Sequence, residues 1–220
     1  MKYRENRDWD KYWKRAETNL FEKVCSFYRK NIIANSVGYH LNKFFPHKGT
    51  FVETGSGTSQ STVRLKKMDR KLIALDIAKS ALEQAKKVEQ IDECILGDIF
   101  KLPFENSSLD GIWNVGVMEH FTKEEIMKAL SEFSRVLKKG SKVIMFWPPK
   151  WGPVNMGATT IEFLADKILK KKVDLFPDEI NQYSSKIKIK KMAKDAGFSD
   201  TKIIYSVRDL FTHVVVVCRK

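Results

Sequence analysis

The chain has 220 residues, 43% of them hydrophobic, which fits one globular domain with a substantial core. Its three widely spaced cysteines argue against a disulfide framework and for a reducing, cytoplasmic setting, its opening is too polar for a signal peptide, and its longest apolar runs are too short to span a membrane. The formal net charge of +13 is compatible with a nucleic-acid partner, but the lysines are scattered along predicted helix faces and turns, so a solvated lysine-rich surface is favoured.

The chain opens with a segment that has no clear strand pattern. Residues 1–45 are aromatic and helical in character, and they predict an N-terminal helical cap or lid on the rest of the molecule. From about residue 50 to 147, short apolar runs then alternate with amphipathic segments. Strands are expected at 50–54, 71–76, 93–98, 109–116 and 141–149, and helices at 61–68, 78–88 and 122–140. This alternation predicts a parallel sheet with helices on both faces.

The helix expected at 122–140 carries signals at both ends. Thr122 and Glu125 have the T-x-x-E spacing of a capping box, in which each side chain bonds the backbone of the other residue. Lys138, Lys139 and Gly140 are expected to close the helix, because cations and glycine are favoured at helix C-termini.

The strand-helix pattern breaks after residue 147. Turn formers crowd the stretch PPKWGPVNMG, which precedes a plausible helix at 159–172, so residues 148–184 are interpreted as an insertion after the fifth strand. The segments that follow are a helix at 186–198 and two strands at 201–207 and 213–220. Only RDLFT joins the two strands, and so short a connection requires an antiparallel pair. Residues 46–220 are therefore expected to form one α/β domain.

A glycine-rich turn follows the first expected strand, with the sequence Glu53-Thr54-Gly55-Ser56-Gly57. In an open parallel sheet, ligands bind at the carboxyl ends of the strands, near the point where strand order reverses. Gly55 permits a tight turn, and Gly57 lets the backbone approach a ligand closely. Asp76 ends the next strand, where a carboxylate is placed to accept both hydroxyl protons of a ribose.

Two residues help to choose the kind of cofactor. A dinucleotide-binding loop would have glycine at position 60, to bring a helix N-terminus close to the pyrophosphate, and this chain has Gln60. The acidic Glu53 is poorly placed to face a pyrophosphate and better suited to a cofactor with a cationic end and no phosphate.

With these residues identified, the stretch 48–147 resembles the class I S-adenosylmethionine-dependent methyltransferases, especially the small-molecule, type 11-like domain. The family's motif usually reads E-x-G-x-G-x-G; Glu53, Gly55 and Gly57 match it, and Ser59 replaces the last glycine. The resemblance implies a Rossmann-like, seven-stranded, mostly parallel sheet with an antiparallel last strand and helices on both faces. It also implies that residues 148–184 lie on the acceptor side.

The resemblance implies S-adenosylmethionine as the cofactor and methyl transfer by in-line displacement as the reaction. Asp76 matches the acid that holds the ribose, Asp98 and Ile99 would flank the adenine, and Asn114 to Gly116 would line the methionine end. The full set of expected cofactor residues is Glu53, Thr54, Gly55, Ser56, Gly57, Asp76, Ile77, Asp98, Ile99, Asn114, Val115 and Gly116. No Cys/His pair has metal-ligand spacing, so no metal is expected.

The acceptor side is less well marked. His120, just beyond the fourth strand, is the candidate general base, although it is equally placed to cap the next helix or to contact the cofactor without titrating. Residues expected to edge the acceptor site are Trp13, Trp147, Trp151, Arg208 and His213. Core packing of the aromatic residues and a solvated hairpin at 208–213 are the alternative interpretations.

The favoured function is methyl transfer to a small-molecule acceptor. The net charge motivates an RNA- or protein-directed methyltransferase as an alternative, but NVGV stands where a base-amine methyltransferase would have an NPPY-like motif. A nicotinamide-dependent oxidoreductase is disfavoured by Gln60. A non-catalytic module that binds the cofactor as a signal is a further alternative, and the sequence leaves the oligomeric state open.

Overall fold

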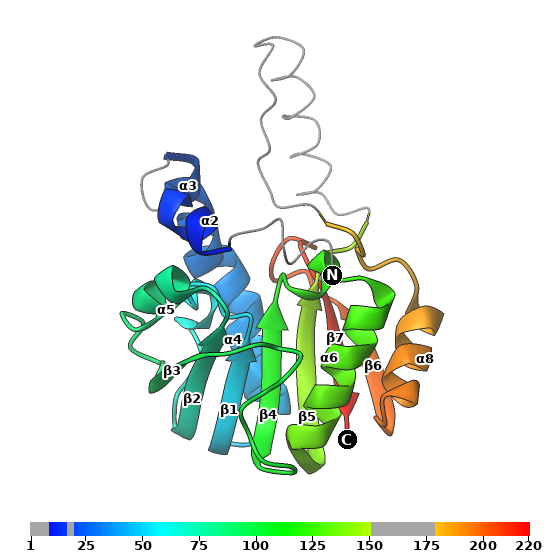
Figure 1. Ribbon diagram of the computed structural model, residues 1–220. Coiled ribbons are helices and arrows are strands. Elements are labelled where there is room, and N and C mark those ends of the chain that lie inside the picture. The colour runs from blue at the N-terminus through cyan, green and yellow to red at the C-terminus, as the bar shows by residue number, and fades with distance from the viewer. Residues whose placement is uncertain (1–8, 17–19, 151–178) are drawn as a thin grey trace.

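A computed structural model of the chain describes residues 9–16, 20–150 and 179–220. In this part of the chain seven strands form a single sheet, in the order β3-β2-β1-β4-β5-β7-β6 (Figure 1). The strands are β1 Lys48–Thr54, β2 Asp69–Asp76, β3 Glu93–Leu96, β4 Leu109–Val115, β5 Leu137–Trp147, β6 Asp200–Tyr205 and β7 Val214–Arg219. The five strands from β3 to β5 are parallel, and β7 is antiparallel to both of its neighbours. The expected fold class is confirmed.

Helices surround the sheet and account for the described part of the N-terminal segment. The helices are α2 Trp9–Ala16, α3 Leu20–Tyr28, α4 Ala34–Phe44, α5 Lys79–Ala85, α6 Lys123–Val136 and α8 Lys186–Asp195. A π-helical stretch, η1 Arg29–Ile33, joins α3 to α4, and two 3₁₀ turns are η2 Gln60–Thr62 and η3 Met118–His120. None of these helices is long and apolar enough to cross a membrane.

Alternation along the strands builds two separate core layers. Val52 faces the layer covered by α6 and α8, whereas its neighbour Phe51 faces the layer covered by α4. The same alternation separates Ile112 from Trp113 on β4. Because successive side chains of a strand point to opposite faces, strands that are apolar throughout must be buried on both faces. Figure 1 shows α6 and α8 on the near face of the sheet and α4 behind it.

The helix expected at 61–68 is wrong. The chain forms only the turn η2 there, and then runs on to β2. The hydroxyls of Ser61 and Thr62 donate to the carboxyl of Glu53, which fixes this turn against the end of β1. The backbone of Arg64 also packs on α4, where a Cβ on Gly38 would lie 2.7 Å from the Arg64 carbonyl oxygen.

The helix expected at 122–140 begins as predicted and ends early. The Glu125 amide donates to Thr122 Oγ1 at 3.3 Å, and the Thr122 amide donates to Glu125 Oε2 at 3.0 Å, which completes the capping box. The helix ends at Val136, and the expected closing residues Lys138 to Gly140 belong to β5. Strand pairing takes precedence there, since the Gly140 amide donates to the carbonyl of Lys220 at 2.9 Å.

Two expected regions are only partly described. The helical character of the first 45 residues holds for those that the structure covers, and their role as a cap stays a prediction. Most of the expected insertion at 148–184, its helix at 159–172 and Trp151 lie outside the described residues.

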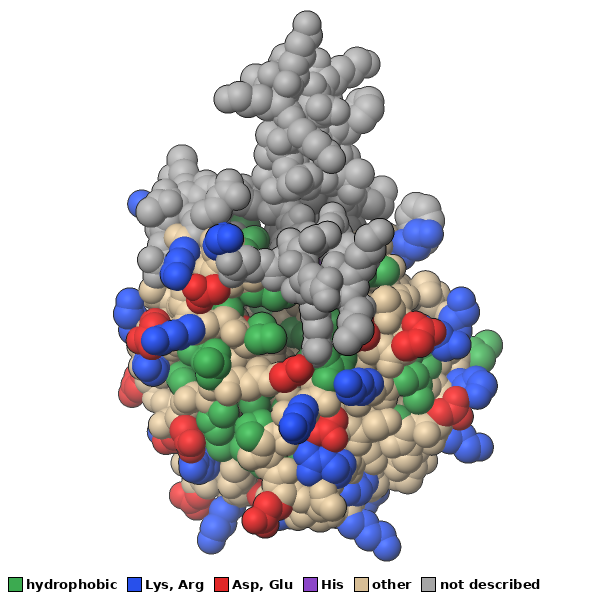
Figure 2. Space-filling model, viewed as in Figure 1, with side chains coloured by type: hydrophobic (Ala, Val, Ile, Leu, Met, Phe, Trp, Pro, Cys, Tyr) green, Lys and Arg blue, Asp and Glu red, His purple; other side chains and the backbone are tan. Residues whose placement is uncertain are grey.

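On the face shown in Figure 2, Lys and Arg side chains are interleaved with Asp and Glu rather than gathered in one patch.

Candidate functional site

The reversal of strand order lies between β1 and β4, and their carboxyl ends carry the loops that form a crevice in such sheets. The two loops are in direct contact. Gly55 has φ +65°, and a Cβ there would lie 2.8 Å from a methyl of Val117 in the loop after β4. Glycine is required at this position by both the backbone conformation and the space. Ser59, where the family has glycine, also has a left-handed φ of 51°.

Asp76 ties the loop after β1 to the end of β2. Its Oδ2 accepts the Gly57 amide at 2.7 Å, and its Oδ1 accepts the Ala78 amide at 2.8 Å. The side chain is 8% exposed, and burial raises the pKa of its carboxyl although these backbone bonds oppose the rise. Each carboxylate oxygen keeps a further lone pair for a ligand hydroxyl.

Glu53 is buried beside the same loop, and its carboxyl is turned toward η2. Oε1 accepts from Ser61 Oγ at 3.3 Å, and Oε2 accepts from Thr62 Oγ1 at 3.0 Å. Burial raises the pKa of Glu53 to about 7 in spite of these bonds. Its described contacts hold the turn, and a contact with the cofactor stays a prediction.

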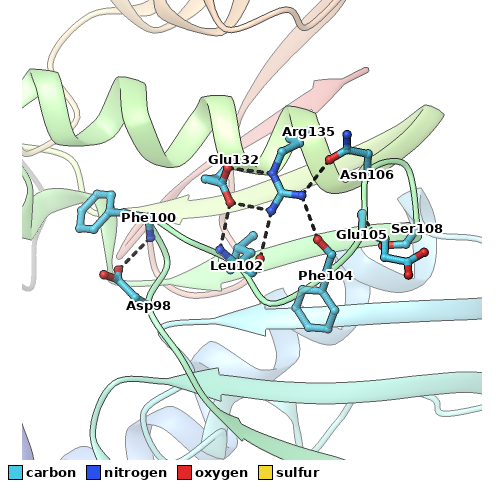
Figure 3. Close-up of polar contacts among 9 residues, drawn as sticks. All are labelled: Asp98, Phe100, Leu102, Phe104, Glu105, Asn106, Ser108, Glu132 and Arg135. Carbon is cyan, nitrogen blue, oxygen red and sulfur yellow. Dashed lines mark hydrogen bonds and ion pairs between the residues drawn. The ribbon is translucent and has the colours of Figure 1, made fainter.

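The loop from 98 to 108 starts at the same carboxyl-end rim, after β3, and ends at the opposite rim of the sheet, where β4 begins. Asp98 Oδ1 accepts the Phe100 amide at 2.9 Å, and Ile99 is buried in the core. Arg135 of α6 clamps the far part of the loop (Figure 3). Its guanidinium donates to the carbonyls of Leu102 and Phe104, to Asn106 and to Glu132. The hollow of about 520 Å³ beside this clamp is lined by these mutually paired groups, so we assign it a structural role.

The end of β4 supplies the next three expected cofactor residues. Asn114 is fully buried, its Nδ2 lies 3.5 Å from Met118 Sδ, and its Oδ1 has no hydrogen-bond partner among the described residues. Val115 is partly buried, and Gly116 has φ +66° and donates its amide to the carbonyl of Phe146. At the end of β2, Ile77 is 57% exposed.

Helix α2 lies against the crevice. The Ser80 amide donates to Asp10 Oδ1 at 2.7 Å, which fixes α2 to the start of α5. The ring of Trp13 lies over Gly57, since a Cβ on that glycine would be 2.6 Å from it. The ring of Trp9 meets that of His120 edge-on, with centroids 5.2 Å apart. The expected base and the glycine loop therefore share one aromatic helix as a neighbour.

The other expected rim residues have separate places. Trp147 is 2% exposed and donates its indole N–H to the Asn181 carbonyl, so it lies in the core and not on an open surface. The guanidinium of Arg208 stacks 3.7 Å from the ring centre of Tyr39. His213 is buried rather than solvated, with Nδ1 3.1 Å from Asp209 Oδ2.

Sequence reasoning missed two buried carboxyls. Asp209 is fully buried in the β6–β7 connection, and Glu119 is 3% exposed in η3, with Oε2 unpartnered within the described part of the chain. Burial raises the pKa of Glu119 well above its usual value. Both residues stand next to charged or polar neighbours in the sequence, so an acid at either position would be expected to point outward. No group of three or more metal-ligating side chains occurs among the described residues.

Comparisons with known proteins agree with this geometry. Residues 52–145 match the family model described as a methyltransferase domain. The biotin biosynthesis bifunctional protein BioHC of Cellvibrio japonicus is 26% identical over 81% of this chain, which spans only 34% of that protein. A demethylmenaquinone methyltransferase of Thermotoga maritima is 28% identical over 88% of this chain and 89% of its own length. A solved S-adenosylmethionine-dependent methyltransferase of Thermotoga maritima shares the fold, with a TM-score of 0.64 at 18% identity over 88% of this chain and 92% of that one.

Proposed function

The chain belongs to the class I S-adenosylmethionine-dependent methyltransferase superfamily, and from this premise we propose that it transfers a methyl group to a small-molecule acceptor. S-adenosylmethionine is the cofactor that this membership assigns to the domain. The relative of nearly equal length is named for demethylmenaquinone, which is a small molecule, and this supports the acceptor class.

The observation that carries the proposal is the bond between the Gly57 amide and Asp76 Oδ2, at 2.7 Å. It holds a glycine turn and a carboxylate together at the point of strand reversal, which is the arrangement that a nucleoside with free ribose hydroxyls requires. The crevice also fits the cofactor chemically. Buried oxygens of Asn114 and Glu119, in and after β4, are without partners in the described structure and are free to accept hydrogen bonds from a ligand.

The chain's own residues would bind and orient the reactants. Asp76 would accept the ribose hydroxyls, Asp98 would meet the adenine, and Gly116 would let the methionine end approach the backbone. When bound, the cofactor supplies an electrophilic methyl group whose bond to sulfur breaks with its electron pair left on sulfur. His120 would accept the proton that the acceptor atom loses, and Trp9 would help to exclude water from it.

Calorimetric titration with S-adenosylmethionine tests the cofactor assignment. We expect the unmodified chain to bind and Asp76→Ala to bind at least about tenfold more weakly, because hydrogen bonds to a charged group contribute about 1.5–3 kcal/mol. Asp195→Ala is the matched control, since Asp195 lies on α8 and pairs there with Lys191. No binding by the unmodified chain, or equal binding by Asp76→Ala, would overturn the assignment.

Labelled methyl groups test the acceptor class. The chain is incubated with methyl-labelled cofactor and with separated cell fractions of small molecules, RNA and protein. We expect label in the small-molecule fraction, and Asp76→Ala should remove it. Label confined to RNA or protein would contradict the proposed acceptor class, and the alternative suggested by the net charge would replace it.

A further inference from the structure

Glu119 is a buried acid, and its described surroundings do not explain why it is buried. Its side chain is 3% exposed, and Oε2 finds no hydrogen-bond partner among the residues that the structure describes. A buried carboxyl left in this way costs free energy, so such groups are retained where a ligand or a reaction uses them.

The carboxyl lies beside Gly116, in the loop after β4. Its Oε1 is 3.3 Å from the position that a Cβ on Gly116 would take, so its approach depends on that residue being glycine. The same atom lies 3.9 Å from Nε2 of His120. The backbone is fixed as well, because the Glu119 carbonyl accepts the amides of Ile180 and Asn181 at 2.7 and 2.9 Å. The carboxyl is therefore held in place rather than free to swing into solvent.

The electrostatic surroundings favour the neutral form of this carboxyl in the ligand-free chain. Burial is the main cause of its raised pKa, and the negative charge of Glu179 raises that pKa further. Among the described residues, His120 is a further titratable neighbour, with Nε2 3.9 Å from Glu119 Oε1. A positive charge brought into the crevice would act in the opposite direction and favour ionisation of Glu119.

We propose that Glu119 gives up its proton when the cationic cofactor binds and then serves as the counter-ion of the sulfonium charge. This inference rests on the proposed function. The cofactor and its product, S-adenosylhomocysteine, carry the same ribose, adenine and amino-acid groups, and differ by the methyl group and the positive charge on sulfur. Glu119 therefore distinguishes the two ligands by charge.

Loss of the Glu119 proton also prepares His120 to take up a proton. An ionised carboxylate 3.9 Å from Nε2 favours the protonated imidazole. Methyl transfer removes the positive charge from sulfur and releases one proton from the acceptor, and His120 takes that proton. The charge near Glu119 is thus balanced before and after the reaction. The balance holds for a neutral acceptor with a lone pair and a proton to lose, such as a hydroxyl or a neutral amine.

The pH dependence of ligand affinity tests the proposal without an acceptor. The dissociation constants of S-adenosylmethionine and S-adenosylhomocysteine are measured by calorimetry between about pH 5 and 8. Below the pKa of Glu119 we expect the affinity for S-adenosylmethionine to rise by up to about tenfold per pH unit, because binding releases one proton. The affinity for S-adenosylhomocysteine should rise less steeply. Burial also raises the pKa values of Glu53 and Asp76, so the Glu119 variant below is needed to assign the difference in slope.

Variants assign the difference to Glu119. Glu119→Gln should give the two ligands the same slope, and the control Glu83→Gln, at an exposed residue paired with Lys86, should keep the difference. Equal slopes in the unmodified chain, or an unchanged difference in Glu119→Gln, would overturn the inference while leaving the proposed function standing. Failure of both ligands to bind would instead overturn the proposed function. If Glu119→Gln does not fold, the number of protons that the unmodified chain releases with each ligand, measured in buffers of different ionisation enthalpy, decides the question.

Discussion

Asp76 and Glu119 are both buried carboxyls at the carboxyl-end rim of one sheet, and the chain treats them in opposite ways. Asp76 accepts two backbone amides, from Gly57 and Ala78, at 2.7 and 2.8 Å. Glu119 leaves one oxygen without a partner in the described structure. Asp76 organises the loops that we propose to hold the ligand, whereas Glu119 is proposed to respond to the positive charge of the ligand. Burial alone therefore does not say what an acid does; its partners do.

Glu53 stands between these two cases. Its partners are the hydroxyls of Ser61 and Thr62, which bond the charged form less strongly than two backbone amides held in a tight loop. Its pKa is raised to about 7, so near neutral pH both the ionised and the neutral carboxyl are populated. The three acids differ in the kind of donor: Asp76 has two backbone amides, Glu53 has two side-chain hydroxyls, and one oxygen of Glu119 has no partner in the described structure.

The largest effect on stability is expected at the fully bonded acid. Asp76→Ala leaves the buried amides of Gly57 and Ala78 without acceptors, and we expect a loss of about 2–4 kcal/mol in the free energy of unfolding. Urea unfolding followed by circular dichroism measures it. Asp195→Ala, on the exposed end of α8, should change the stability by no more than about 0.5 kcal/mol. Equal losses in the two variants would break the contrast.

Glu53 should make stability depend on pH. Its pKa in the folded chain, about 7, lies above its usual 4.5, so its contribution is full below pH 4.5 and is lost as the pH rises through 7. We expect Glu53→Gln to remove a fall on the order of 2 kcal/mol between about pH 5 and 7.5. Glu83→Gln, at an exposed residue paired with Lys86, is the control and should leave the slope unchanged. A slope that persists in Glu53→Gln would assign the fall to another group.

Replacement of Glu119, in contrast to Asp76→Ala, should raise the free energy of unfolding. Because Glu119 is buried without full hydrogen bonding, Glu119→Met should raise the free energy of unfolding by about 1–2 kcal/mol at pH 8. The gain should shrink toward pH 5, since the raised pKa of Glu119 means that its neutral form is then present at little cost. Thermal unfolding at both pH values measures the change. Destabilisation at pH 8 would mean that Glu119 has a structural partner.

The smallest effect is expected at the hydroxyls that hold Glu53. Thr62→Val removes the donor to Glu53 Oε2 with little change in shape, and we expect it to cost about 1 kcal/mol at pH 8. The cost should diminish at low pH, where the carboxyl is protonated and is a poorer acceptor. Thr201→Val, on β6 at the far edge of the sheet, provides a control whose cost should not vary with pH in this way.

The fold followed from patterns that repeat along the chain. Continuous apolar runs such as 143–147 of β5 and 214–218 of β7 need two covered faces. The short connection expected at RDLFT required an antiparallel end, and in the structure it spans residues 206–213. The errors occurred where single long-range contacts decide the structure. The segment expected as a helix at 61–68 forms only the turn η2, whose hydroxyls bond Glu53, and Lys138 to Gly140 belong to β5 instead of the end of α6.

The site was predictable where backbone conformation dictates the residue. Gly55 and Gly57 have positive φ and contacts that exclude a Cβ, and such positions carry a signature in the sequence. Burial of a carboxyl carries none: the apolar neighbours Val117, Met118 and Phe121 indicate a buried turn, but an acid at position 119 would be expected to point out of it. Trp147 is the opposite case: it was expected to edge the acceptor site, and it is buried in the core.

The central claim is that the crevice between the loops after β1 and β4 binds S-adenosylmethionine. A crystal structure of the chain grown with S-adenosylhomocysteine tests it most directly. We predict that the ribose hydroxyls bond Asp76, that the adenine lies beside Asp98 and Ile99, and that the methionine end lies against Gly116 within reach of Glu119. A ligand bound elsewhere, or a crevice that stays without ligand at saturating concentration, would contradict the account.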